Sequence, residues 1–174
     1  MSIGWAEHFN FEIFSQTTPQ KFSGFVTVAK LSKESCRQAP EQPGVYMVYS
    51  PSCNCPRFCN PGSGGHFRGK DPNVTLEKLK EKWVEKAHII YIGKAGSANS
   101  KATLRSRLTQ YMRFGEEKPV PHWGGRYLWQ VPYAKACLVA WRAIPGEEAR
   151  KYEKELLKGF KKCYAKLPFA NLCG

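Results

Sequence analysis

The sequence contains no long hydrophobic run, no internal repeat and no low-complexity tract. No stretch approaches the roughly 18 consecutive apolar residues of a membrane-spanning helix, so we expect no membrane partner. Residues 1–8 lack the basic and apolar regions of a signal peptide, and we therefore expect a cytoplasmic protein. The length of 174 residues predicts one compact domain, residues 1–174, that is large enough for a hydrophobic core.

Acidic residues are scarce, because the chain has 14 Asp and Glu against 27 Lys and Arg, a formal net charge of +13. Such an excess favours a polyanionic partner and an attraction that weakens as salt is added. Charge alone also fits a generally basic, soluble protein. Aromatic side chains lie among the cations in residues 111–129, a mixture typical of nucleic-acid surfaces. The candidate nucleic-acid-binding residues are Lys101, Arg105, Arg113, His122 and Arg126.

The seven cysteines are an odd number, which argues against a disulfide scaffold. We expect four scattered ones to serve as small hydrophobic residues: Cys36, Cys137, Cys163 and Cys173. The other three lie in a Pro- and Gly-rich segment, residues 50–75, which we interpret as an insertion loop. With one histidine they form a chemically adequate set of ligands for a structural zinc: Cys53, Cys55, Cys59 and His66. Their spacing differs from that of standard zinc fingers, so free reduced cysteines in a mobile loop are the alternative.

Short β-branched and aromatic runs indicate strands, and apolar residues at helical spacing indicate helices. The predicted strands are 22–31, 43–46, 89–94, 136–144 and a short one at 127–130. The predicted helices are 32–39, capped by Ser32, and 76–87, 104–111 and 147–160. This order predicts an α+β fold, in which helices flank a small, mainly antiparallel, three-stranded sheet. An N-terminal extension, residues 1–42, would precede the first motif strand.

The helix predicted at 147–160 carries one glutamate on its apolar side. At about 100° per residue, Glu153 projects within about 60° of four apolar residues. These residues are Ala149, Leu156, Leu157 and Phe160. Burying even a neutral polar group without a partner costs about 2–7 kcal/mol, so such a carboxylate usually has a cation, a metal or a catalytic task. The alternative is a rotated helix that places Glu153 at the stripe edge, paired with a lysine.

The helix predicted at 104–111 shows a similar pattern with arginine. Its apolar face consists of Leu104, Leu108, Tyr111 and Phe114. Arg107 points along the edge of that face, whereas Arg105 is on the far side. A buried glutamate and a half-buried arginine on two helices, with tyrosines on neighbouring strands, are the parts of a hydrolytic phosphodiester site.

Gly-Val-Tyr at residues 44–46, followed by Tyr-Ile-Gly at 91–93, resembles the name motifs of the GIY-YIG nuclease superfamily. The resemblance extends to Arg107, which is followed by a tyrosine four residues later, and to Glu153 before a Leu-Leu-Lys run. It ends in a Pro-x-x-Asn motif that closes at Asn171. The Pro-Gly-Val-Tyr and Tyr-Ile-Gly-Lys-Ala runs are close to those of the bacterial excision-repair incision subunit and of small GIY-YIG endonucleases. Motifs in this order over most of the chain make the resemblance specific.

The resemblance implies an endonuclease that hydrolyses DNA phosphodiester bonds with Mg²⁺ or Mn²⁺ and without a small-molecule cofactor. Tyr46 would orient or deprotonate the attacking water, and Arg107 would bind the phosphate. Glu153 would hold the metal, as the residue types also suggest. The full set of implied site residues is Tyr46, Tyr91, Lys94, Arg107, Tyr111, Glu153 and Asn171.

The remaining members of this set have supporting roles. Tyr91 and Tyr111 would form hydrogen bonds around the phosphate. Lys94 would stabilise the leaving group or bind backbone phosphate. We expect Asn171 to fix the local structure near Glu153 rather than to act in the chemistry.

The chain departs from compact members of the family by longer segments between Tyr46 and Tyr91, within residues 96–103, and between Glu153 and Asn171. Insertions between elements need not disturb a site. Two other classes of function stay open on the sequence. One is a non-catalytic nucleic-acid-binding module on the same scaffold, and the other is a zinc-stabilised adaptor built on the cysteine loop.

Overall fold

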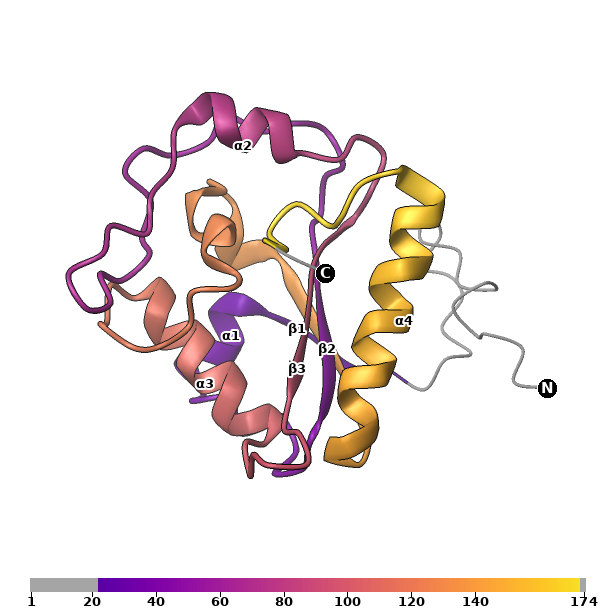
Figure 1. Ribbon diagram of the computed structural model, residues 1–174. Helices are drawn as coiled ribbons and strands as arrows, with labels where there is room; N and C mark the ends of the chain where they lie inside the picture. The colour runs from indigo at the N-terminus through magenta and orange to yellow at the C-terminus, as the bar shows by residue number, and fades with distance from the viewer. Residues whose placement is uncertain (1–21, 173–174) are drawn as a thin grey trace.

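The computed structural model describes residues 22–172 (Figure 1). It has the α+β class that the sequence predicts, with one antiparallel sheet and helices beside it. The strands are β1 (Ser23–Thr27), β2 (Gly44–Tyr49), β3 (Ile89–Ala95) and β4 (Leu138–Ala143). The helices are α1 (Val28–Lys33), α2 (Leu76–Lys82), α3 (Leu104–Gly115) and α4 (Gly146–Tyr164), with the 3-10 turns η2 (Arg126–Gln130) and η3 (Ala134–Ala136).

The sheet has four strands in the order β1-β4-β2-β3, where the sequence predicts three. The fourth is β1, which comes from the predicted strand 22–31 and pairs antiparallel with β4. This strand stops at Thr27, because its hydroxyl oxygen accepts a hydrogen bond from Lys30 N at 3.2 Å and caps α1. The predicted helix 32–39 with Ser32 as its cap is therefore wrong: the helix begins earlier, at Val28.

Two further elements differ from their predictions. The predicted strand 127–130 is wrong, because this segment is the turn η2, in which Leu128 N donates to Gly125 O at 3.2 Å. All four of its residues are buried, so the segment has no solvent face of the kind that a surface strand presents. The predicted helix 76–87 is shorter, since α2 ends at Lys82. The next residue, Trp83, has an extended backbone and a buried side chain.

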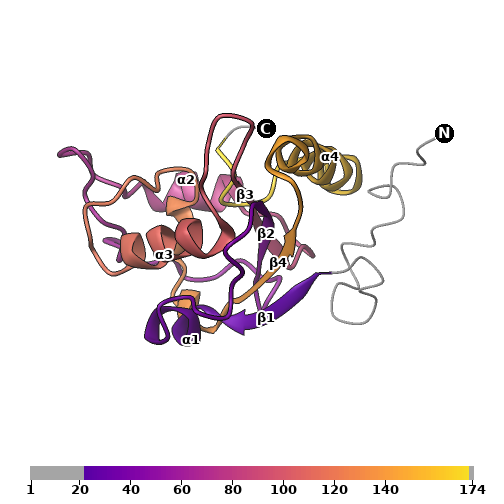
Figure 2. The ribbon, with the colours of Figure 1, turned by 90° about the horizontal axis from the view of Figure 1, so that it is seen from below.

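The helices cover the two faces of the sheet, with α4 on one side of the strands and α1 and α3 on the other (Figure 2). On the α4 side, Leu156 and Phe160 are fully buried with strand residues that include Met47 and Ile92. On the other side, Tyr111 of α3 lies in a second core. The strand β3 is at the end of the sheet order and runs between α3 and α4 (Figure 1). Side chains from both helices can therefore meet at its free edge.

The segment 50–75 contains no helix or strand, apart from one isolated bridge between Phe67 and Lys70. A side chain of η2 holds it in place. Gln130 accepts a hydrogen bond from Val74 N at 2.9 Å through Oε1. Its Nε2 donates to Val74 O at 3.0 Å and to Cys59 O at 3.1 Å. The amide of Gln130 thus supplies bonds that a neighbouring strand would otherwise supply.

The predicted N-terminal extension is described only from residue 22 onward, and its described part forms β1 and α1 of the fold. The predictions for residues 1–8 and for Cys173 lie outside the described residues. Within residues 22–172, no helix combines the length and the apolar composition needed to cross a membrane.

Candidate active site

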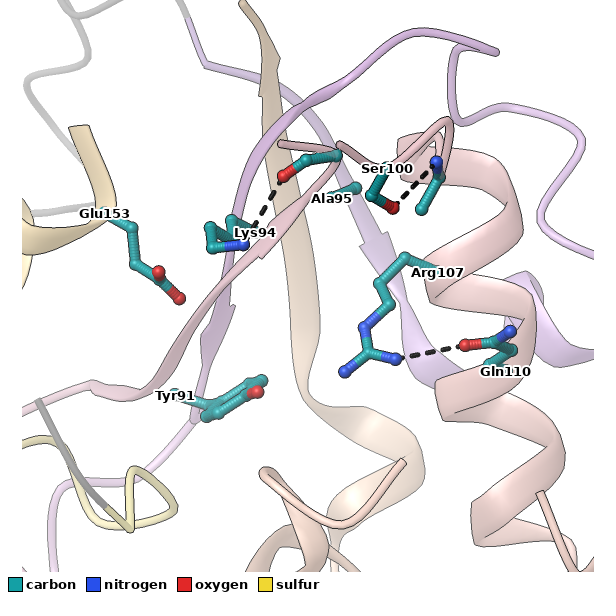
Figure 3. A pocket seen from close by; sticks show the side chains of 9 residues that line it. Tyr91, Lys94, Ala95, Ser100, Arg107, Gln110 and Glu153 are labelled. Carbon is teal, nitrogen blue, oxygen red and sulfur yellow. Dashed lines mark hydrogen bonds between the residues drawn. The ribbon is translucent and has the colours of Figure 1, made fainter. Parts of the chain in front are cut away.

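A pocket of about 290 Å³ lies at the edge of β3, between α3 and α4 (Figure 3). Its lining residues are Tyr91, Lys94, Ala95, Gly96, Ser100, Ala102, Arg107, Gln110 and Glu153. Both helices, the strand β3 and the loop that follows it contribute to the wall. Four of the site residues implied by the sequence therefore line one cavity, although they come from segments far apart in the chain.

The ring of Tyr46 lies behind this pocket, where a glycine of β3 leaves room for it. Tyr46 on β2 is the register partner of Gly93 on β3. A Cβ atom at Gly93 would lie 2.6 Å from the Tyr46 ring, which is closer than real Cβ atoms approach other atoms. Only glycine therefore lets the ring pass over β3 at this point. Tyr46 itself is fully buried and does not line the pocket.

Tyr46, Tyr91 and Tyr111 form a cluster of rings. The Tyr91 ring centroid lies 5.9 Å from that of Tyr46 and 5.4 Å from that of Tyr111. Burial raises the pKa of Tyr46 and of Tyr111 well above the ordinary value; Tyr91 raises both further, and Arg107 opposes the shifts. The Tyr111 hydroxyl donates a hydrogen bond to Gly125 O at 2.8 Å, and Tyr111 does not line the pocket. This arrangement disfavours the predicted contact of Tyr111 with phosphate, because its hydroxyl proton is already used.

Glu153 is half-buried at the edge of the apolar side of α4, with its carboxylate turned toward the space between the two helices (Figure 3). Burial raises the pKa of Glu153, and Lys94 is the cation that opposes the shift most, followed by Arg150 and Arg107. Among residues 22–172, no ion pair within 4.0 Å involves Glu153. The carboxylate is thus neither enclosed by the apolar stripe nor bound to a lysine. It is desolvated on one side and open to the pocket on the other.

The guanidinium of Arg107 is held by two neighbours. Its Nη1 donates to Gln110 Oε1 at 3.1 Å and to Pro121 O at 3.3 Å. Figure 3 shows the guanidinium turned toward the middle of the pocket. Gln110 carries no motif signal in the sequence. Its spacing of three residues from Arg107, which places both side chains on one helix face, is the only sign of this pairing.

The pocket is electrostatically positive. Lys94 lines it, with Nζ donating to Gly96 O at 3.4 Å. Four cations oppose the raised pKa of Glu153, and so all of them lie within electrostatic reach of its carboxylate: Lys94, Arg150, Arg107 and Lys154. One carboxylate among four cations leaves a net positive field, which suits a phosphate group.

His122 does not lie on the surface, so its predicted contact with nucleic acid is wrong for this arrangement. Its side chain is fully buried and its ring stacks on Tyr111, with the centroids 4.1 Å apart. Burial lowers the pKa of His122 well below the ordinary value, and the charge of Arg107 lowers it further. Neither ring nitrogen has a hydrogen-bond partner among the residues that the structure describes. His122 is a neutral packing residue under the Tyr111 ring.

Arg105 is also not available for the predicted contact with nucleic acid. Its Nε donates to Ala39 O at 2.9 Å, its Nη2 donates to Arg37 O at 3.1 Å, and its Nη1 bonds to the Glu41 carboxylate. These bonds tie α3 to the chain that leads into β2. The physical reason is that this loop lies against the far side of α3 and supplies acceptors for all three nitrogen atoms of the guanidinium.

The other three candidates differ in exposure. Arg126 is half-buried, with its guanidinium carbon 4.5 Å from the Trp123 ring centroid and 4.9 Å from that of Tyr127. Burial lowers its pKa from the ordinary value. Lys101 and Arg113 are exposed. These two are the candidates whose charges face solvent.

Asn171 supports β3 from outside the sheet. Its Oδ1 accepts a hydrogen bond from Ile92 N at 2.9 Å, and its Nδ2 donates to Ile92 O at 2.8 Å. Because β3 is an edge strand, these backbone groups have no neighbouring strand to pair with. Asn171 therefore fixes the strand between Tyr91 and Gly93, and the expectation that it fixes the structure near Glu153 stays a prediction.

The proposed zinc ligands are not brought together. Within residues 22–172, no three His, Cys, Asp or Glu side chains are placed to hold a metal ion. The thiols of Cys53, Cys55 and Cys59 are free, and His66 pairs instead with Asp71, with 3.7 Å between Nε2 and Oδ1. The side-chain amide of Gln130 contacts the segment instead, at Cys59 and Val74. The predicted zinc site is therefore wrong for the described residues.

Comparison of the chain with protein-family models, with curated proteins and with solved structures finds no match. Membership of the GIY-YIG superfamily accordingly stays a prediction from the motifs, and the function has to be argued from the chemistry of the pocket.

Proposed function

We propose that the protein is a metal-dependent endonuclease of the GIY-YIG type that hydrolyses phosphodiester bonds in DNA. The observation that carries this proposal is the convergence of a carboxylate, a guanidinium, an ammonium and a phenol on one pocket. These groups belong to Glu153, Arg107, Lys94 and Tyr91. Phosphodiester hydrolysis needs a positioned water, neutralisation of the phosphate charge and stabilisation of the leaving oxygen. The net charge of +13 supports a polyanionic substrate.

Arg107 binds the scissile phosphate in this proposal. A guanidinium offers a planar fork of N–H donors that matches two phosphate oxygens. The bonds from Nη1 to Gln110 and to the Pro121 carbonyl fix the plane of the group and leave its other donors for the phosphate. Lys94 adds a second positive charge on β3, which stabilises the charge that develops on the leaving oxygen.

Glu153 is the residue that would hold a divalent cation. Mg²⁺ keeps several waters and accepts one or two carboxylates beside substrate phosphates, so a single carboxylate at an open pocket fits Mg²⁺ or Mn²⁺. When bound, the cation supplies charge neutralisation at the phosphate and lowers the pKa of a coordinated water. Because burial raises the pKa of Glu153, protons compete with the cation for this carboxylate.

The tyrosines orient the attacking water rather than deprotonate it. A phenol acts as a base only when it is ionised, and burial keeps the pKa of Tyr46 well above its ordinary value. At neutral pH the hydroxyl therefore stays protonated, and it both donates and accepts hydrogen bonds. We assign the direct contact to Tyr91, because it lines the pocket whereas Tyr46 lies behind it.

Incubation with supercoiled plasmid tests the proposal. The protein should produce nicked or linear DNA with Mg²⁺ or Mn²⁺ and none when EDTA is added. The variant Glu153→Gln keeps the size of the side chain and should produce none with either metal. If the wild-type protein binds duplex DNA but leaves plasmid intact with both metals, the nuclease is rejected in favour of a non-catalytic binding module.

A further inference from the structure

The outward face of α4 carries a continuous band of positive charge. The helix packs its apolar side on the sheet, where Ala149, Leu156 and Phe160 are fully buried. The opposite side carries six exposed cations: Arg150, Lys151, Lys154, Lys158, Lys161 and Lys162. Three acids, Glu147, Glu148 and Glu155, lie on the same helix outside its buried side, so the cations remain in excess there. Three of the spacings are of four residues, so the cations follow one another along the helix surface.

This band begins beside the proposed active site. At about 100° per residue, Arg150, Lys154 and Lys161 all project within about 100° of Glu153. Arg150 and Lys154 also oppose the raised pKa of Glu153, which shows that they lie within electrostatic reach of its carboxylate. A shallow hollow of about 430 Å³ follows the helix beyond this point. Four cations line it, Arg150, Lys151, Lys154 and Lys158, together with the two carboxylates of Glu147 and Glu155. The positive surface thus continues from the pocket along α4.

Five of the six cations of the band are not held in ion pairs within the described part of the chain, although Glu147 and Glu155 lie among them. Among residues 22–172, no ion pair involves Arg150, Lys151, Lys154, Lys158 or Lys161. Like charges four residues apart on a helix repel one another and destabilise it. An external polyanion that lies along this row would offset the repulsion between its cations and would lead into the positive pocket.

We propose that the band on α4 binds the sugar–phosphate backbone of the DNA that enters the pocket, and this inference rests on the proposed function. From Arg150 to Lys161 the helix rises about 16 Å at 1.5 Å per residue, which is about five nucleotide steps at 3.4 Å per step. The contacts carry charge only, so they add affinity without sequence preference.

An anionic membrane is the competing partner for a basic helix. Helices that lie on membranes present apolar side chains next to their cations and insert them among the lipids. The apolar side of α4 is instead buried against the sheet, and Leu156 and Phe160 have no exposed surface. Charge without an accessible apolar face favours nucleic acid over a lipid surface.

The test replaces three charges of the band and compares the variant with a matched control. The triple variant Arg150→Gln, Lys154→Gln and Lys158→Gln retains good helix formers at exposed positions, so it should fold normally, as circular dichroism would show. Its affinity for a 30-base-pair duplex in EDTA should fall at least about tenfold. The slope of log affinity against log salt should fall in magnitude by about three, one for each lost contact.

The control removes three positive charges on the other face of the sheet, with Lys30→Gln, Lys33→Gln and Lys135→Gln. These lysines are exposed on α1 and η3. Figure 2 shows α1 on the side of the strands away from α4, and η3 packs in the same core as α1. Their loss should change duplex affinity by less than about threefold, since only the net charge differs. Equal losses in the two triple variants, or an unchanged affinity of the α4 variant, would overturn the inference.

Two further measurements separate the possible failures. If the α4 variant loses binding to phosphatidylserine vesicles but keeps duplex affinity, the band is a lipid surface and the inference is wrong. Plasmid cleavage by the wild-type protein is scored independently. Duplex binding that depends on the band, without any cleavage, would reject the nuclease and support the band. If the wild-type protein cleaves plasmid but the α4 variant binds the duplex as tightly as the wild type, the nuclease is supported and the band is rejected.

Discussion

The cysteine-rich segment 50–75 concentrates reactive side chains in the sequence, whereas the pocket at the edge of β3 brings such side chains together from distant segments. In the pocket, Glu153 and Arg107 project from two helices that pack against a common sheet. In the segment, the thiols of Cys53 and Cys55 extend from irregular backbone, which Gln130 contacts at Cys59 and Val74. Spacing in the sequence predicts convergence when rigid elements hold the side chains, and it predicts much less within a loop.

The comparison also separates activity from stability. Pocket residues face a cavity and have few protein partners. Replacing them should therefore abolish activity while the folded structure and its stability stay intact. Residues that tie segments together, such as Arg105 and Gln130, have their polar atoms bound to backbone. Replacing those residues should lower the free energy of unfolding, but each molecule that remains folded should keep its activity.

The largest expected effect is on activity, in Glu153→Gln. Plasmid nicking should fall by at least about 100-fold, because the only carboxylate of the pocket is lost. The matched control is Glu155→Gln on the same helix. Glu155 lines the outer hollow rather than the pocket, and its loss should change nicking by less than about twofold. Similar losses in the two variants would show that the charge of α4, and not the pocket carboxylate, governs cleavage.

The second effect contrasts Arg107→Ala with Arg105→Ala. The first variant should lower nicking by about 100-fold with little change in thermal stability, since the guanidinium faces the pocket. The second should lower the free energy of unfolding by about 1–3 kcal/mol, because bonds to two backbone carbonyls and one carboxylate are lost. Nicking assays beside chemical denaturation would measure both. If Arg105→Ala lost cleavage but kept its stability, the structural role of Arg105 in tying α3 to the chain before β2 would be contradicted.

The third effect concerns Gln130→Ala in the contact between η2 and the segment 50–75. The side chain is buried and makes three hydrogen bonds to backbone groups of Val74 and Cys59. Their loss leaves buried groups unpaired and should lower the free energy of unfolding by about 2–4 kcal/mol. Proteolysis should then cut residues 50–75 first. A variant with unchanged stability would mean that something other than Gln130 orders the segment.

A smaller effect links the pocket carboxylate to pH. The pKa of Glu153 is raised in the folded protein, so the folded state holds this proton more tightly than the unfolded state. The resulting stabilisation is present below the unfolded pKa and is lost as the pH rises through the folded pKa. Glu153→Gln does not titrate, so its melting temperature relative to the wild type should be higher at pH 7 than at pH 4. A difference that is constant with pH would show that the carboxylate is not desolvated.

The smallest effect is expected for Cys53→Ser combined with Cys55→Ser. Trp83 Nε1 bonds to the backbone oxygen of Cys53 at 3.1 Å, which the substitution leaves in place. The free energy of unfolding should therefore change by less than about 0.5 kcal/mol. Elemental analysis should detect no zinc in protein purified without chelator. If the wild-type protein contains stoichiometric zinc and the double variant does not, the segment binds zinc. The contrast between the segment and the pocket would then be wrong.

Local periodicity alone determined the directions of the two central site residues. Helical phasing predicts Glu153 within the apolar stripe of its helix and Arg107 at the edge of the apolar face. Both side chains line the pocket, with Glu153 at the edge of the apolar side rather than in its middle. The motif strands around Tyr46 and Tyr91 also form where β-branched and aromatic runs predict them. These features follow from the sequence because the direction of a side chain depends on the backbone period of its own element.

Only the tertiary structure decided what each side chain meets. Arg105 bonds to a loop, His122 is buried under a ring, and the Tyr111 hydroxyl is taken by Gly125. The strand β1 was predicted as a strand, but its place as the fourth strand depends on pairing with β4, more than a hundred residues away. The Pro121 carbonyl, fourteen residues along the chain, accepts a second hydrogen bond from the Arg107 guanidinium that the helix spacing does not predict. Such contacts join segments that are distant in the chain, so packing rather than local preference sets them.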